Sequence, residues 1–345
     1  MVNYTLWGTN VDIQIPKETF PSEADLKLMD EVLCNPTHGF FPTIRGKLHY
    51  RYNAPKTPQP KAVVVWQHGI QGYGGKGFIH SDGSRVSTAL LIQSLTDAGM
   101  GVYTLDMYGH GFSEGHRFFI PESNYMNNCT DLIDFTTFVS KEYQNKGMEN
   151  LPLFLAGESY GGTLTIHAAK FFQDHPDKSP SGFRGIGLIA PAIIGDLPSK
   201  PVVLLLRYIL APMFAKWQPF FMPNPVSADR IWRDKEAYDH FTAGIDLKAQ
   251  LHGGGRPFSL GTAVGLLTAL ESVRKIIPEL TVPYCVLHGQ NDYAVKVSGT
   301  EYLQKHAKST VKEIHIVDGA LHDLLSDPTR HEAVKTLIQW ITSRI

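Results

Sequence analysis

The segment LPLFLAGESYGGTLTIHAAKFF, residues 151–172, carries the pattern that decides the fold. Its apolar start is typical of a buried strand, and TLTIHAAKFF continues as a helix. Between them stands GESYGG, residues 157–162, a Gly-x-Ser-x-Gly sequence. So sharp a turn has no room for side chains at the two glycines, and it pushes the Ser159 hydroxyl out above the sheet edge. The helix N-terminus beneath favours developing negative charge. We therefore predict a strand, a strained turn and a helix, with Ser159 as a nucleophile.

Short apolar or alternating runs recur on both sides of this segment, separated by stretches with helical spacing. Continuous apolar strands of this kind are typically buried on both faces of a parallel sheet. Alternation of such strands with helices predicts a doubly wound α/β sheet. The strand-like runs are GKLHYRY from Gly46, AVVVWQ from Ala62, GVYTL from Gly101, GIGLIA from Gly185, VPYCVLHG from Val282 and VKEIHIV from Val311.

One region interrupts this rhythm. From Gly195 to Pro283 the chain has helical patterns, several prolines and three consecutive glycines, but no good strand. We expect residues 195–282 to be an inserted, mostly helical subdomain. The α/β core would then comprise residues 45–194 and 283–345, preceded by an N-terminal extension, residues 1–44, with one short helix.

A serine hydroxyl needs a base, usually His, and a group that holds the His tautomer. With a serine on this kind of turn, the acid and then the base follow along the chain. Asp292 comes just past the strand VPYCVLHG, and His322 just past EIHIV. Ligand-facing residues of open α/β sheets collect at such strand ends. We therefore predict Asp292 as the acid and His322 as the base. The rival acids are Asp318, Asp323 and Asp327, and the rival bases are His288 and His315.

An oxyanion hole requires two backbone N–H groups. One should come from Tyr160, the residue after the nucleophile, and the other from Ile70 or Gly69 after the strand AVVVWQ. The glycine-rich GYGGKG, residues 72–77, lacks the glycine spacing of a phosphate-binding loop, and Lys76 is not followed by Ser or Thr. We interpret it as a flexible rim loop.

Composition and targeting signals exclude several classes. The 32 basic and 33 acidic residues nearly cancel, so no net field attracts nucleic acid. The first 18 residues lack a signal-peptide pattern, and the most apolar stretch, residues 202–217, is too short and too interrupted to span a membrane. Three scattered cysteines indicate free thiols in a reducing compartment, with no spacing for a zinc site: Cys34, Cys129 and Cys285. We expect a cytoplasmic protein.

Five segments together resemble a known family: HG at 68–69, DMYGHGFSEG at 106–115, GESYGG, HGQND at 288–292 and GALH at 319–322. The family is the serine-hydrolase branch with monoacylglycerol lipases, lysophospholipases and the plant caffeoylshikimate esterase. The resemblance runs from about Arg45 to the C-terminus. It implies the α/β-hydrolase fold, with a mostly parallel, doubly wound sheet and the helical insertion as a cap over the active site.

The resemblance also implies hydrolysis of a lipid carboxylic ester, a monoacylglycerol or a lysophospholipid, without cofactor or metal. Two departures bear on substrate identity: Tyr160 stands where the family often has Met, and the loop from Tyr73 to Arg85 is longer. An esterase of short or aromatic esters, a peptidase of the same fold and a non-catalytic binding protein remain as alternatives.

Large apolar residues of the cap could line an acyl tunnel or dip into a membrane surface. We expect replacement of Phe220 and Phe221 with Ser to weaken lipid binding. Because an unperturbed His titrates near 6.5, the rate should rise from about pH 5.5 to about 7.5. The expected substrate-binding residues are Leu205, Ile209, Met213 and Phe214.

Overall fold

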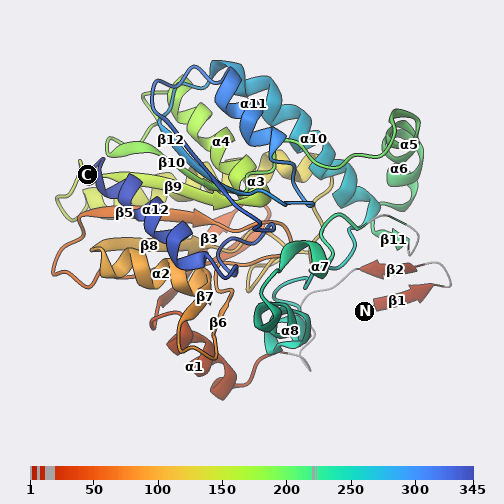
Figure 1. Ribbon diagram of the computed structural model, residues 1–345, viewed down its shortest axis with the longest axis horizontal. Helices are drawn as coiled ribbons and strands as arrows, with labels where there is room; N and C mark the ends of the chain where they lie inside the picture. Colours follow the sequence, from red (N-terminus) through yellow and green to blue (C-terminus); the bar gives the residue numbers. More distant parts are fainter. Residues whose placement is uncertain (1, 6–7, 12–19, 220–221, 223) are drawn as a thin grey trace.

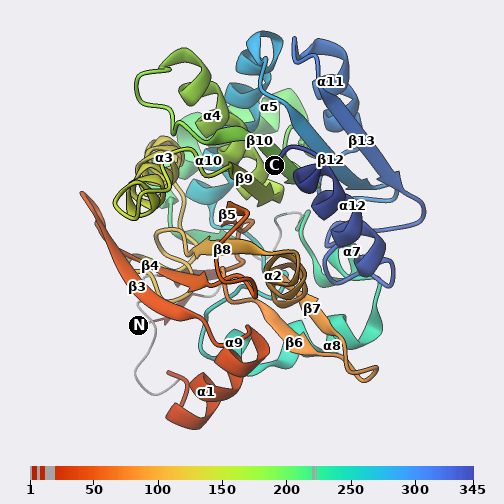
Figure 2. The ribbon, with the colours of Figure 1, turned by 90° about the vertical axis from the view of Figure 1, so that its left-hand side faces the viewer.

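The computed structural model describes residues 2–5, 8–11, 20–219, 222 and 224–345, and an eight-stranded sheet lies at its centre (Figures 1 and 2). The strands are β3 (Thr37–Thr43), β4 (Gly46–Asn53), β5 (Ala62–Gln67), β8 (Met100–Leu105), β9 (Leu153–Glu158), β10 (Phe183–Ile189), β12 (Tyr284–Gly289) and β13 (Lys312–Val317). Their spatial order is β13-β12-β10-β9-β5-β8-β4-β3. Neighbours from β13 to β8 are parallel, and β4 pairs antiparallel with both β8 and β3. The predicted mostly parallel sheet is confirmed.

Helices cover both faces of this sheet, as Figure 1 shows. On one face lie α3 (Glu122–Gln144), α4 (Ser159–Asp174), α10 (Leu260–Ile276) and α11 (Ser298–His306), and on the other lie α2 (Thr88–Asp97) and α12 (Arg330–Thr342). The fully buried strand β5 shows why its sequence is continuously apolar. Val63 and Val65 pack into the first layer, whereas Val64 and Trp66 pack into the second.

The edge strand β13 departs from the expected burial. Its residues are mostly half-buried or exposed, although VKEIHIV was expected to be a strand covered on both faces. The cause is its position, because β13 pairs on one side only, with β12. His315 therefore pairs with Glu313 at the half-exposed edge, with 2.9 Å between Nε2 and Oε1.

The N-terminal region contributes strands as well as the predicted short helix. The helix α1 (Glu23–Val32) is capped by Ser22, whose hydroxyl accepts a hydrogen bond from the Asp25 N–H. Strand β3 pairs with β4, so the central sheet begins upstream of the predicted core boundary at residue 45. Further upstream, β1 (Val2–Thr5) pairs with β2 (Gly8–Val11), and β2 pairs with β11 (Trp217–Pro219) of the insertion.

The described residues of the insertion between β10 and β12 are mostly helical, and they include the short strand β11. Its last long helix, α10, packs on α3 and α4 and is continuous with the core. A hairpin of β6 (Gly77–Ile79) and β7 (Arg85–Ser87) occupies the long loop after β5. The other insertion elements are α5 (Lys200–Leu205), the π-helix η2 (Leu206–Leu210), α6 (Ala211–Phe214), α7 (Ala228–Ile231), α8 (Lys235–Ala243), α9 (Ile245–Lys248) and η3 (Ile277–Glu279).

Among the residues that the structure describes, no helix combines the length and the apolar character that crossing a membrane requires.

Candidate active site

Ser159 occupies a strained turn between β9 and α4. Its φ is +51°, in the left-handed region that L-residues other than Gly seldom adopt. The flanking glycines are required by space. A Cβ on Gly161 would collide with the carbonyl oxygen of Gln67, and one on Gly157 would lie 2.6 Å from the carbonyl oxygen of Gly161. The turn thus has the geometry that the sequence motif predicts.

His322 and Asp292 are in direct contact, with 2.6 Å between His322 Nδ1 and Asp292 Oδ2. The other carboxylate oxygen, Oδ1, accepts the backbone N–H groups of Ala294 at 2.9 Å and Val295 at 2.8 Å. Burial by itself would raise the pKa of Asp292. The charge of His322 and hydrogen bonds from His288 and His322 outweigh burial and lower that pKa below 3.8. Asp292 is therefore a fixed carboxylate that orients one ring nitrogen of His322.

The rival base His288 contacts Asp292, and two of the rival acids pair with basic side chains. His288 Nε2 lies 3.2 Å from Asp292 Oδ2, and its Nδ1 lies 2.7 Å from the hydroxyl of Thr300. This buried imidazole contacts the Asp292 carboxylate, and the contact was missed because the place of His288 inside a strand gave no sign of its partner. Asp327 pairs with Arg233 of the insertion. Asp323 pairs with Lys76.

Ser159 and His322 line the same small cavity, of about 60 Å³, at the carboxyl edge of the sheet. Gly69 and Ile70, the candidate oxyanion residues, line it as well. The structure therefore brings together residues that follow β5, β9 and β13.

The two candidate oxyanion donors after β5 differ in their surroundings. The backbone N–H of Gly69 is directed at Oε1 of Glu158, at 3.5 Å, which leaves Ile70 as the better donor from this loop. Tyr160 is in the first turn of α4, where backbone N–H groups have no partner within the helix. Its buried side chain accepts a hydrogen bond from Asn128 at 3.3 Å.

The interpretation of residues 72–77 as a flexible rim loop was wrong. The Gly74 N–H donates to Oδ1 of buried Asp106 at 2.7 Å, and the Lys76 side chain is buried at the cavity wall. A Cβ on Gly75 would come within 2.9 Å of the Arg51 guanidinium. The glycines thus allow close packing of the loop against the core.

The predicted acyl-binding residues do not line the cavity beside Ser159. Their side chains are largely exposed on α5, η2 and α6, and none of the four lines the cavity beside Ser159: Leu205, Ile209, Met213 and Phe214. The insertion instead supplies Val226, Ile231, Trp232, His252, Gly254 and Gly255 to the cavity wall. No sequence spacing could indicate these residues, because they come from several short elements and turns. Phe220 and Phe221 lie outside the described residues.

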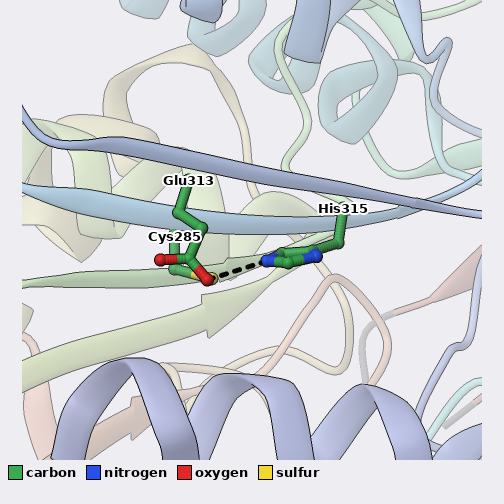
Figure 3. Close-up of side chains that lie close together, drawn as sticks. All are labelled: Cys285, Glu313 and His315. Atoms are coloured by element: carbon green, nitrogen blue, oxygen red, sulfur yellow. Dashed lines mark hydrogen bonds and ion pairs between the residues drawn. The ribbon is translucent and has the colours of Figure 1, made fainter. Parts of the chain in front are cut away.

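A second group of reactive side chains lies at the sheet edge, where Cys285, Glu313 and His315 have potential metal-ligand atoms within 4.8 Å of one another (Figure 3). Glu313 and His315 already contact each other, with 2.9 Å between Nε2 and Oε1, and burial raises the pKa of the Cys285 thiol to about 12. A His–Glu contact on the edge strand over a buried, protonated thiol accounts for the three residues.

The parallel sheet, the serine on its strained turn and the Asp-paired His together define a serine hydrolase of the α/β-hydrolase fold. Residues 58–329 match the family model described as serine aminopeptidase, S33, and the chain belongs to this family.

Curated relatives cover most of the chain. It is 27% identical over 304 residues to a monoglyceride lipase of Rattus norvegicus, covering 86% of this chain and 88% of the relative. It is 24% identical to a caffeoylshikimate esterase of Arabidopsis thaliana, covering 89% of this chain and 85% of the relative. Among solved structures, a soluble variant of the Saccharomyces cerevisiae monoglyceride lipase in complex with a substrate analogue aligns with a TM-score of 0.68. It shares 20% sequence identity and covers 90% of this chain and 96% of that one.

Proposed function

We propose that the chain hydrolyses carboxylic esters of lipids, with monoacylglycerols as the preferred substrates. The observation that carries this proposal is the 2.6 Å contact between His322 and Asp292 beside the cavity that His322 shares with Ser159. Relatives that are named monoglyceride lipase, from Rattus norvegicus, Homo sapiens and Mycolicibacterium smegmatis, support the substrate class.

The proposed reaction proceeds through an acyl-enzyme. Ser159 Oγ attacks the ester carbonyl carbon while His322 Nε2 takes its proton, and Asp292 holds the opposite ring nitrogen. The N–H groups of Ile70 and Tyr160 stabilise the oxyanion. His322 then protonates the leaving alcohol, and a water activated by the same His322 releases the fatty acid.

A substrate panel on the purified protein tests the substrate class. It comprises a long-chain monoacylglycerol, a lysophospholipid, an aromatic ester and an aminoacyl amide, each compared with the Ser159→Ala variant as a blank. The highest kcat/KM is expected for the monoacylglycerol. The family description makes the amide the informative rival, and preference for it would establish a peptidase instead.

The pH dependence should be shifted from that of a free imidazole. Burial lowers the pKa of His322, but the charge and hydrogen bond of Asp292 outweigh burial, so the pKa is raised above 6.5. The base works only when neutral, and a raised pKa moves the rise in kcat/KM to higher pH. We expect the midpoint above pH 6.5, measured with a short ester whose ionisation is constant over the range. A midpoint below pH 6 would contradict the Asp292–His322 pairing.

We further propose that residues 195–282 act as a cap and that this cap contacts membrane surfaces, in a cytoplasmic protein. Large apolar side chains are exposed on the consecutive elements α5, η2 and α6, and Figure 1 shows α5 and α6 at the upper right of the molecule. Burying such a side chain contributes roughly 1.5–3 kcal/mol each, which favours contact with lipid. The exposed residues are Val202, Leu204, Leu205, Tyr208, Ile209, Met213 and Phe214.

The double variant Ile209→Ser/Met213→Ser tests this surface. Liposome binding and activity on a long-chain monoester should both fall, because two exposed apolar side chains are lost, whereas activity on a soluble acetyl ester should stay within about twofold. Binding is measured by liposome co-sedimentation. The control is Ile44→Ser, which replaces a 97% exposed apolar residue outside the cap. Unchanged liposome binding with loss of acetyl-ester activity would show that these residues only pack the fold.

A further inference from the structure

A buried ion pair joins the loop after β5 to the turn that carries His322. Lys76 Nζ lies 2.6 Å from Asp323 Oδ2, and the two side chains are only 9% and 4% exposed. Removing two charges from water is costly, and such a pair rarely gives net stability over an apolar pair of the same shape. Its place at the wall of the cavity beside Ser159 suggests a role in the reaction.

The Asp323 carboxylate has several hydrogen-bond partners, and none of them is His322, its neighbour in sequence. Besides Lys76, Oδ2 accepts the Trp232 Nε1–H at 2.8 Å and the Ser326 hydroxyl at 2.9 Å. Oδ1 accepts the Ser326 N–H at 3.1 Å, and the Asp323 N–H donates to the carbonyl oxygen of Ile231 at 3.1 Å. The turn is therefore held through both its backbone and its side chain.

The partners of this ion pair come from the cap. The Lys76 ammonium lies 5.3 Å from the ring centre of Trp232 and 4.5 Å from that of Phe241, distances typical of cation–π contacts. We call Lys76, Trp232, Phe241 and Asp323 the Lys76 cluster. It brings together three segments distant in sequence: the loop after β5, the cap around α7 and α8, and the turn of the base.

We propose that Asp323 is a positioning residue for His322, and that through the Lys76 cluster it makes the placement of the base depend on a docked cap. This inference rests on the proposed function. Asp292 fixes the ring of His322 at Nδ1, but it does not fix the backbone that carries the ring. Asp323 follows His322 directly in the chain. It is hydrogen-bonded to the cap through the carbonyl oxygen of Ile231 and the Nε1–H of Trp232. A misplacement of about 1 Å between reacting groups can cost on the order of 10²-fold in rate.

The test compares single and charge-matched variants on a soluble p-nitrophenyl ester. Asp323→Asn and Lys76→Met each leave an unpaired buried charge or donor, so both could impair the fold. The double variant Lys76→Met/Asp323→Asn removes both charges together. We expect all three to lower kcat on the order of 10²-fold with KM nearly unchanged, because the affected interaction acts in the transition state. Inactivation by a fluorophosphonate probe at Ser159 should slow in parallel.

A matched control separates this role from cap docking in general. Arg233 of the cap also pairs with a buried carboxylate, Asp327, but neither residue lines the cavity. Arg233→Met should keep kcat within about threefold. If the double variant did not fold, as judged by circular dichroism, Trp232→Phe would decide, because it removes the Nε1–H bond to Asp323 and keeps an aromatic ring beside Lys76. Its kcat should fall roughly tenfold.

Three results would overturn the inference: normal kcat in the double variant, normal kcat in the single variants, or equal losses in Arg233→Met. The first would mean that the cluster only neutralises a buried charge, and the last that any loosening of the cap suffices. A wild-type protein that neither hydrolyses esters nor reacts with the probe would instead refute the proposed function.

Discussion

Ser159→Ala is expected to lower kcat on the order of 10⁴-fold or more while the protein folds normally. The substitution removes the attacking oxygen and keeps the Cβ, so the turn at φ +51° and the packing of its glycines are unchanged. Activity is measured on a soluble short ester, and folding by circular dichroism and thermal unfolding. Residual rate from binding and the oxyanion donors should remain above that of water.

Labelling by a fluorophosphonate probe gives an independent measure of the same residue. Wild type should be labelled once, and Ser159→Ala not at all. The control is Ser140→Ala, which alters another buried serine hydroxyl, on α3 outside the cavity, and should be labelled like wild type. Esterase activity that persists in a clean Ser159→Ala preparation would place the nucleophile elsewhere.

Asp292→Asn should also cost on the order of 10⁴-fold in kcat. Oδ1 accepts two backbone N–H groups, from Ala294 and Val295, so the side-chain oxygen of Asn must stay at that position. The NH₂ group then occupies the position of Oδ2 and donates to Nδ1 of His322. This stabilises the tautomer whose Nε2 carries the proton, which cannot act as the base.

The rival acids provide the comparison. Asp318→Asn should stay within about threefold of wild type, because surface substitutions away from special features have small effects. Asp323→Asn should show the intermediate loss expected of a positioning residue. A larger loss in Asp323→Asn than in Asp292→Asn would transfer the role of the acid to Asp323.

The sheet and the residues of the proposed triad were predictable because each lies next to a strong local signal. Ser159 follows the apolar run of β9, Asp292 follows that of β12, and His322 follows β13. Parallel strands end at one edge of a sheet, so residues just past those ends converge without further information. The His322–Asp292 contact agrees with that expectation.

What could not be predicted depends on contacts between segments without such signals. Strand β3 contains Gly39 and Pro42, which weaken any strand pattern, and only its place at the sheet edge tolerates the proline. Apolar character in residues 202–214 was visible, but not which face would be buried: Leu206, Leu210 and Ala211 pack inward, whereas most of the other large apolar side chains are exposed. The pairing of Lys76 with Asp323 joins residues from two turns, and nothing in either turn indicates the other.

The positive φ of Ser159 also means that the proposed nucleophile lowers the stability of the fold that holds it. A left-handed backbone costs an L-residue roughly 1–2 kcal/mol, a sizeable part of the roughly 5–15 kcal/mol by which domains remain folded. Glycine would adopt this backbone conformation without strain, but it has no hydroxyl that could act as a nucleophile. Selection for heat tolerance and selection for turnover therefore oppose each other at this single position. Contacts elsewhere in the chain must supply the free energy of unfolding that the strained turn removes.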